Sequence, residues 1–85
     1  MTSNIGFYIN LSPGVAPLEA IRVINRTPGA AGRTVWNGAI YIDAPDRPTL
    51  VEAMDALIRA ALVDVGPQGA EDCVNWALDP RRGNP

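Results

Sequence analysis

The sequence predicts a single α+β domain whose elements follow the order strand, helix, strand, strand, helix, strand. Three observations support this order. Apolar residues alternate near the N-terminus, an Asn-Gly pair separates two strand-like runs, and an apolar stripe at helical spacing follows in the second half. The domain is expected to span residues 1–79, and residues 80–85 are expected to form a flexible tail.

The first strand is predicted over residues 5–11, because every second residue there is apolar: Ile5, Phe7, Ile9 and Leu11. A helix follows from Pro17, since proline at the first turn of a helix loses no hydrogen bond. That helix is expected to end by Thr27, because Pro28 disfavours helical geometry in the residue before it.

The Asn37-Gly38 pair indicates a tight β-hairpin. Both residue types tolerate the positive φ angles of a type I′ turn, and strand-like runs flank them at 34–36 and 39–42. A hairpin with a two-residue loop predicts three cross-strand pairs: Trp36 with Ala39, Val35 with Ile40, and Thr34 with Tyr41.

The second helix is predicted to begin near Thr49, where Thr49 and Glu52 match a capping box, and to end at Gly66-Pro67. The segment after it alternates in polarity. We interpret it as a last strand, with Val74, Trp76 and Leu78 facing inward and Asn75 facing outward. A short helix over 70–78 is the alternative.

These elements predict a ferredoxin-like βαββαβ two-layer sandwich, in which a four-stranded antiparallel sheet carries two helices on one face. Each helix would connect two parallel strands, as the right-handed crossover rule allows. If the last segment is helical instead, the sheet has three strands and the class remains α+β.

The residue content argues against an enzyme. The 85 residues include no histidine and a single cysteine, Cys73, so Ser-His-Asp and Cys-His arrangements and cysteine-pair metal sites are excluded. Asp43 with Asp46, and Glu71 with Asp72, are interpreted as turn residues, because Asp bonds nearby backbone N–H groups. We therefore expect no catalytic residue, no metal and no cofactor.

The charge content argues against direct nucleic-acid binding. Nine acids outnumber seven bases, and the net charge is −2, whereas nucleic-acid binders neutralise phosphates with a basic surface. The N-terminus has neither a basic nor an apolar signal region, and no stretch is long enough to span a bilayer, so a cytoplasmic location without membrane contact is expected. All seven bases are arginine, which is typical of a GC-rich bacterium or its phage.

The strand alternation also predicts a binding surface. The sheet face away from the helices is expected to collect the candidate partner-binding residues Tyr8, Asn10, Trp36, Tyr41 and Asp43. Aromatic residues among polar ones are typical of protein interfaces. Two such faces packing together would form a homodimer; alternatively, the rings merely cover the sheet. Stacking on RNA is disfavoured, because RNP motifs and positive charge are missing.

The leading functional hypothesis is a non-catalytic protein-binding module. In general character, and not through any motif, the chain resembles the small acidic inhibitors of phages and mobile elements, including anti-CRISPR proteins. That resemblance implies a basic nucleic-acid-binding surface of a host complex as partner. The acids that would meet such a surface are Asp43, Asp46, Asp55, Glu71 and Asp72. The alternative is a small-molecule-binding regulatory domain acting as a homodimer.

Overall fold

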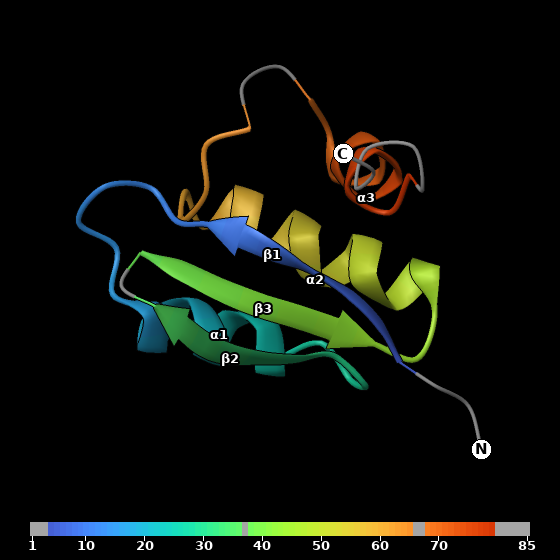
Figure 1. Ribbon diagram of the computed structural model, residues 1–85, viewed down its shortest axis with the longest axis horizontal. Coiled ribbons are helices and arrows are strands. Elements are labelled where there is room, and N and C mark those ends of the chain that lie inside the picture. Colours follow the sequence, from blue (N-terminus) through green and yellow to red (C-terminus); the bar gives the residue numbers. More distant parts are fainter. Residues whose placement is uncertain (1–3, 37, 66–67, 80–85) are drawn as a thin grey trace.

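The computed structural model describes residues 4–36, 38–65 and 68–79. Its elements are β1 (Ile5–Asn10), α1 (Pro17–Asn25), β2 (Ala31–Trp36), β3 (Ala39–Ala44), α2 (Arg47–Arg59) and α3 (Ala70–Ala77). The strands form a three-stranded antiparallel sheet in the order β1-β3-β2 (Figure 1). The α+β class is confirmed, and the four-stranded βαββαβ order is wrong.

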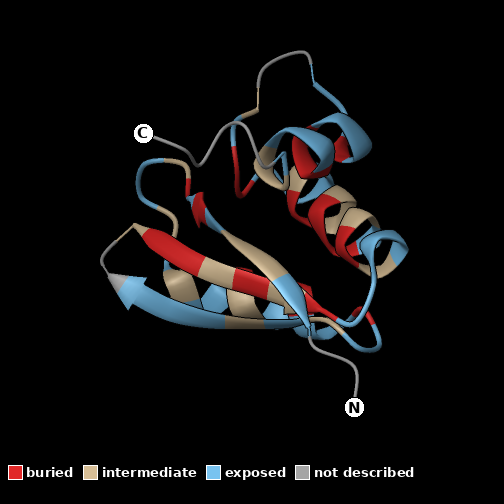
Figure 2. Cartoon of the chain, turned by 45° about the vertical axis from the view of Figure 1, so that its right-hand side comes forward, coloured by how far each residue is buried: buried red, intermediate tan, exposed pale blue. Residues whose placement is uncertain are grey.

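The helices lie on one side of the sheet. Helices α1 and α2 cover one face of it, and α3 packs against α2 (Figure 1). Figure 2 shows the resulting core, in which buried residues follow β3 and the inner side of α2. Its largest fully buried side chains are Ile24, Ile40, Ile42, Leu50, Leu57 and Val74. The opposite sheet face carries no helix of the described chain.

The last segment is a helix, so the predicted strand is wrong. Ala70, Cys73 and Val74 are buried, and their i, i+3, i+4 spacing is that of one helix face. Trp76, expected to point inward, is 55% exposed. The helical conformation is favoured because it places all three of these side chains against α2. A strand would instead bury every second residue of the segment at the edge of the sheet. Asn75 is exposed and accepts a hydrogen bond from the Arg47 guanidinium of α2.

A β-bulge changes the predicted hairpin register. Trp36 does pair with Ala39, as expected, but the register shifts between Thr34 and Trp36, which leaves Val35 as an extra residue. Thr34 therefore pairs with Ile40 instead of Tyr41. The two predicted pairs beyond Trp36 are wrong, and the residues of β2 before the bulge change faces.

Helix α2 begins earlier than predicted. Its N-cap is Asp46, whose carboxylate accepts hydrogen bonds from the Thr49 backbone N–H (2.9 Å) and the Thr49 hydroxyl (2.5 Å). The Thr49–Glu52 capping box is therefore wrong. Pro48 lies in the first turn, where it loses no hydrogen bond, so the helix can begin at Arg47, directly after Asp46, which was interpreted as a turn residue.

Helix α2 also ends earlier than predicted, at Arg59 instead of at Gly66-Pro67, because Ala61 adopts a left-handed conformation (φ 59°) and the N–H groups of Ala61 and Leu62 donate to the carbonyl oxygens of Ile58 and Leu57.

The positions of the other elements agree with the sequence. Helix α1 begins at Pro17 and ends at Asn25, within its predicted limits. At the hairpin, Gly38 has φ +83°, the left-handed geometry that Asn-Gly turns require. Its partner Asn37 lies outside the described residues, as do residues 80–85, which were expected to form a tail.

The described chain forms a small globule with a radius of gyration of 12.0 Å. None of the helices in its described parts is both long and apolar enough to cross a membrane.

Candidate functional site

The candidate site is the sheet face opposite α1 and α2, which we call the open face. Its members are the residues whose side chains alternate away from the helix-facing core: Gly6, Tyr8, Asn10, Ala31, Arg33, Ala39, Tyr41 and Asp43. Four of the five predicted site residues, Tyr8, Asn10, Tyr41 and Asp43, are among them. Trp36 pairs with Ala39 at the end of β2, but its side chain lies outside what the structure describes.

Tyr8 and Tyr41 form the centre of the open face. They are cross-strand partners of β1 and β3. Their rings meet edge to face, with centroids 4.9 Å apart and planes inclined at 62°. Such pairs favour this geometry, because the positive edge of one ring meets the negative face of the other. Tyr8 remains 63% exposed, so most of its ring surface is accessible.

Gly6 makes room for the Tyr41 ring. A Cβ atom at position 6 would stand 2.7 Å from the Tyr41 hydroxyl oxygen and would also overlap the carbonyl oxygen of Ile42. Glycine is therefore required at this point of β1, because a larger residue would displace the ring or the strand. The ring accordingly lies along the sheet surface.

Arg33 belongs to the same cluster, and the sequence did not predict it. In the bulged register it pairs with Tyr41, and its guanidinium carbon lies 5.0 Å from the Tyr41 ring centroid, a cation–π distance. Its Nη2 atom is 3.9 Å from Oδ2 of Asp43, and the Arg33 side chain is 73% exposed. That ion pair is long and solvated, so it orients the guanidinium more than it stabilises the fold.

The surface around Arg33 is only slightly hollowed. A depression of about 120 Å³ is lined by Ala31, Gly32, Arg33, Tyr41 and Asp43. Sites for drug-sized ligands usually enclose roughly 300–1,000 Å³. The depression therefore has room for a side chain of a partner, and it is too small to enclose a metabolite.

A second, larger groove lies between α2 and α3. It measures about 440 Å³ and is lined by Arg47, Pro48, Val51, Glu71 and Asn75. The hydrogen bond from Arg47 to Asn75 joins its two walls. The lining of the groove thus combines the apolar side chains of Pro48 and Val51 with charged groups of both signs.

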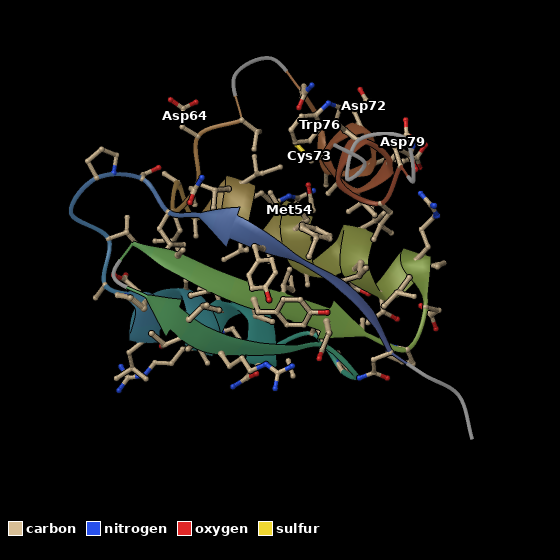
Figure 3. All side chains as sticks on the ribbon, in the orientation of Figure 1. Met54, Asp64, Asp72, Cys73, Trp76 and Asp79 are labelled. Atoms are coloured by element: carbon tan, nitrogen blue, oxygen red, sulfur yellow. The ribbon has the colours of Figure 1, made fainter. Side chains whose placement is uncertain are left out.

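The acidic residues proposed to meet a basic partner are divided among several elements. Asp43 lies on the open face beside Arg33, and Asp46 caps α2. Asp55 is paired with Arg59, with 2.8 Å between Oδ2 and Nε. Glu71 and Asp72 occupy the first turn of α3. Figure 3 shows Asp72 on the outer side of α3 and Asp64 on the segment between α2 and α3.

Cys73 has the environment of a packed thiol. It is 8% exposed, lies on the α3 side that faces α2 and its Met54 (Figure 3), and donates a 3.5 Å hydrogen bond to Oε1 of Gln68. Desolvation by burial, and to a smaller extent the charge of Asp72, raises the pKa of the thiol. The thiol is therefore protonated at neutral pH, which makes it a poor nucleophile.

Within residues 4–36, 38–65 and 68–79, no three side chains of the metal-ligating types come together as a cation site. Comparisons with protein-family models, with curated protein sequences and with solved structures gave no significant match to this chain.

Proposed function

We propose that this chain is a non-catalytic protein-binding module whose open face contacts a partner protein. The observation that carries the proposal is the row formed by Tyr8, Tyr41 and Arg33, in which an exposed ring, a second ring and an exposed guanidinium contact one another. Tyrosine and arginine are enriched among residues that dominate binding energies at protein interfaces.

The mutual contacts of this row support a prepared binding surface. Edge-to-face packing holds Tyr8 against Tyr41, and the cation–π contact holds Arg33 over the same ring. Side chains that are ordered before binding lose less conformational entropy when the complex forms. The small size of the depression beside Arg33 also favours a protein over an enclosed small molecule.

The net charge of −2 supports a partner with a basic surface, because opposite charges accelerate association. In this proposal the chain acts as a small inhibitor of phage or mobile-element type, which covers a functional surface of a host complex. The open face contacts the partner, and the acidic residues of α3, Glu71 and Asp72, attract its basic surface over a longer distance.

A pull-down tests the proposal. The tagged chain is immobilised, incubated with a lysate of a GC-rich bacterium, and compared with its Tyr8→Ala and Glu52→Ala variants, Glu52 being exposed on α2. We expect the wild type and Glu52→Ala to retain the same protein, and Tyr8→Ala to lose it. Absence of any reproducible partner, or equal retention by all three, would contradict the proposal.

The groove between α2 and α3 supports a second candidate, binding of a small molecule. Its volume of about 440 Å³ falls within the usual range for ligand sites, and Arg47 and Glu71 offer charges of both signs. A thermal-shift screen of amino acids and nucleotides tests this, because a ligand of the folded state raises the melting temperature. Loss of that shift in Arg47→Ala would place the ligand in the groove.

Homodimerisation through two open faces is a further form of the protein-binding proposal. Light scattering after size exclusion would then give twice the monomer mass of 9.0 kDa. Tyr8→Ala would restore the monomer, and a wild-type monomer at high concentration would rule this form out.

A further inference from the structure

Strand β2 forms an edge of the sheet, and its outward main-chain groups can be identified. The Leu11 N–H donates to the carbonyl oxygen of Gly38 (2.8 Å), so positions 11 and 38 are a hydrogen-bonded pair of the β1–β3 ladder. Bonded pairs alternate along antiparallel strands. The odd-numbered residues of β3, Tyr41 among them, therefore bond to β2, while Gly32 and Thr34 direct their N–H and C=O groups away from the sheet.

This edge is accessible. Arg33, Thr34 and Val35 are exposed, and Figure 2 shows β2 largely in the exposed colour, in contrast to the buried β3. The opposite edge, β1, lies on the side of the sheet where α3 packs onto α2 (Figure 1). An added strand would therefore encounter less steric hindrance at the β2 edge than at the β1 edge.

Apolar side chains lie next to the β2 edge. A Cβ atom at Gly32 would stand 3.5 Å from Cγ1 of Ile21, so α1 passes directly beneath the strand. Leu18 precedes Ile21 by one helical turn and is 59% exposed, and Val35 at the bulge is 40% exposed. Side chains of an added strand that point to the helix side would cover this apolar surface.

Arg33 determines the charge that an added strand requires. Its side chain stands on the open face, and its ion pair with Asp43 spans 3.9 Å toward β3. The residue of an added strand opposite Arg33 would have its Cβ about 4.5–5.5 Å away. A carboxylate there would be attracted, whereas a second copy of β2 paired through its centre would bring two Arg33 side chains together.

We propose that β2 binds an extended segment of a partner protein as a fourth strand, with an acidic side chain opposite Arg33 and apolar side chains on either side of it. The main chain of the segment bonds to Gly32 and Thr34, and its apolar side chains reach over Ile21 and Leu18. Strand addition of this kind obtains affinity from the main chain and specificity from alternate side chains. The inference rests on the proposed protein-binding function and specifies how the partner binds, as an extended segment along the β2 edge.

Selection of short random peptides displayed on phage against the purified chain tests this directly. We expect enriched peptides to have the pattern apolar–acidic–apolar. In ¹⁵N NMR titrations they should shift the amide signals of Gly32 and Thr34 most strongly. No enrichment, or enriched peptides that shift only residues of β1 or of the α2–α3 groove, would overturn the proposal.

Two variants of Thr34 isolate the main-chain contact. Among the main-chain hydrogen-bonding groups, Thr34→Pro removes only an N–H group that points away from β3, a position where an edge strand accepts proline. Thr34→Val retains that group and also replaces the threonine side chain. We expect Thr34→Pro to weaken peptide binding about tenfold or more, and Thr34→Val to leave it nearly unchanged. Should Thr34→Pro fail to fold, N-methylation of the peptide amides that face Gly32 or Thr34 makes the same test. Equal affinities of methylated and unmethylated peptides would then contradict strand addition.

Removing or reversing the charge at Arg33 tests the side-chain contact separately from the main-chain contact. Arg33→Gln should reduce the preference for an acidic over an amide residue in the peptide by roughly two- to fivefold, and Arg33→Glu should select peptides with a basic residue instead. An unchanged peptide preference would refute the charge pairing. If the pull-down partner is lost in Tyr8→Ala and retained in Thr34→Pro, the proposed function stands and the fourth-strand inference fails.

Discussion

The ring of Tyr41 lies across Gly6, so closely that a Cβ atom at position 6 would stand 2.7 Å from the Tyr41 hydroxyl oxygen. The two residues belong to the neighbouring strands β1 and β3. Because Gly6 has no side chain, the Tyr41 ring occupies the space above it. The exposed ring of Tyr8 packs against Tyr41 from the same surface. The geometry of the open face therefore depends on a glycine in β1.

Gly6→Ala is expected to destabilise the fold by about 1–3 kcal/mol, because the new methyl group overlaps the Ile42 carbonyl as well as the Tyr41 ring. The free energy of unfolding from urea denaturation measures the effect. Gly69→Ser is the matched control, since a Cβ atom there meets nothing within 4 Å and serine is a favourable N-cap for α3. Equal stability of Gly6→Ala and the wild type would show that Tyr41 does not occupy this position.

Val74→Ala and Trp76→Ala distinguish a helix from a strand over residues 70–77. Val74 is fully buried and Trp76 is 55% exposed, so we expect a loss of about 1–3 kcal/mol for Val74→Ala and a distinctly smaller loss for Trp76→Ala. In the predicted strand both side chains would face inward, so both substitutions would lower the free energy of unfolding by a similar amount. Thermal unfolding followed by circular dichroism compares the two variants.

Asp46→Ala is expected to destabilise the N-terminus of α2, since its carboxylate accepts two hydrogen bonds from Thr49. These bonds lower the pKa of Asp46 from its usual value of 3.8. Because the pKa is depressed in the folded state, the stabilisation is present above the unfolded pKa and is lost as the pH falls through the folded pKa. Wild type and Asp46→Ala should therefore differ in melting temperature at pH 7 and converge in strong acid. A difference independent of pH would argue against a charged cap.

Cys73 is expected to react slowly with iodoacetamide in the folded protein, because burial raises the pKa of its thiol and limits access. Unfolding in urea should accelerate alkylation strongly. The raised pKa also means that the contribution of the neutral thiol to stability is present below the unfolded pKa and is lost as the pH rises through the folded pKa. Alkylation at equal rates in the folded and unfolded states would contradict the buried position.

The sequence predicted the elements whose signals are local. Alternation defined β1, Pro17 marked the start of α1, and Asn37-Gly38 located the hairpin. The strand predicted for the last segment was wrong because two patterns overlap there. Val74, Trp76 and Leu78 alternate as in a strand, whereas the apolar residues Ala70, Cys73, Val74 and Ala77 have helical spacing. The packing surface of α2 favours the helical pattern, and that surface exists only in the folded domain.

The candidate site was predicted in part for a similar reason. Tyr8, Asn10, Tyr41 and Asp43 follow from alternation alone and share the open face. Arg33 was missed because the bulge at Val35 shifts β2 by one residue, so that Arg33 pairs with Tyr41 in place of the expected Thr34. An Asn-Gly turn indicates where a hairpin reverses, and it carries no signal for a bulge in the strand before it.

The measurement that tests the central claim most directly is site-specific photo-crosslinking. A benzoylphenylalanine at position 8 or at position 52 compares the open face with the exposed surface of α2. After irradiation in a lysate of a GC-rich bacterium, we predict a covalent adduct with one partner protein from position 8 and no adduct from position 52. Adducts from position 52 alone, or none from position 8, would contradict an open-face binding site.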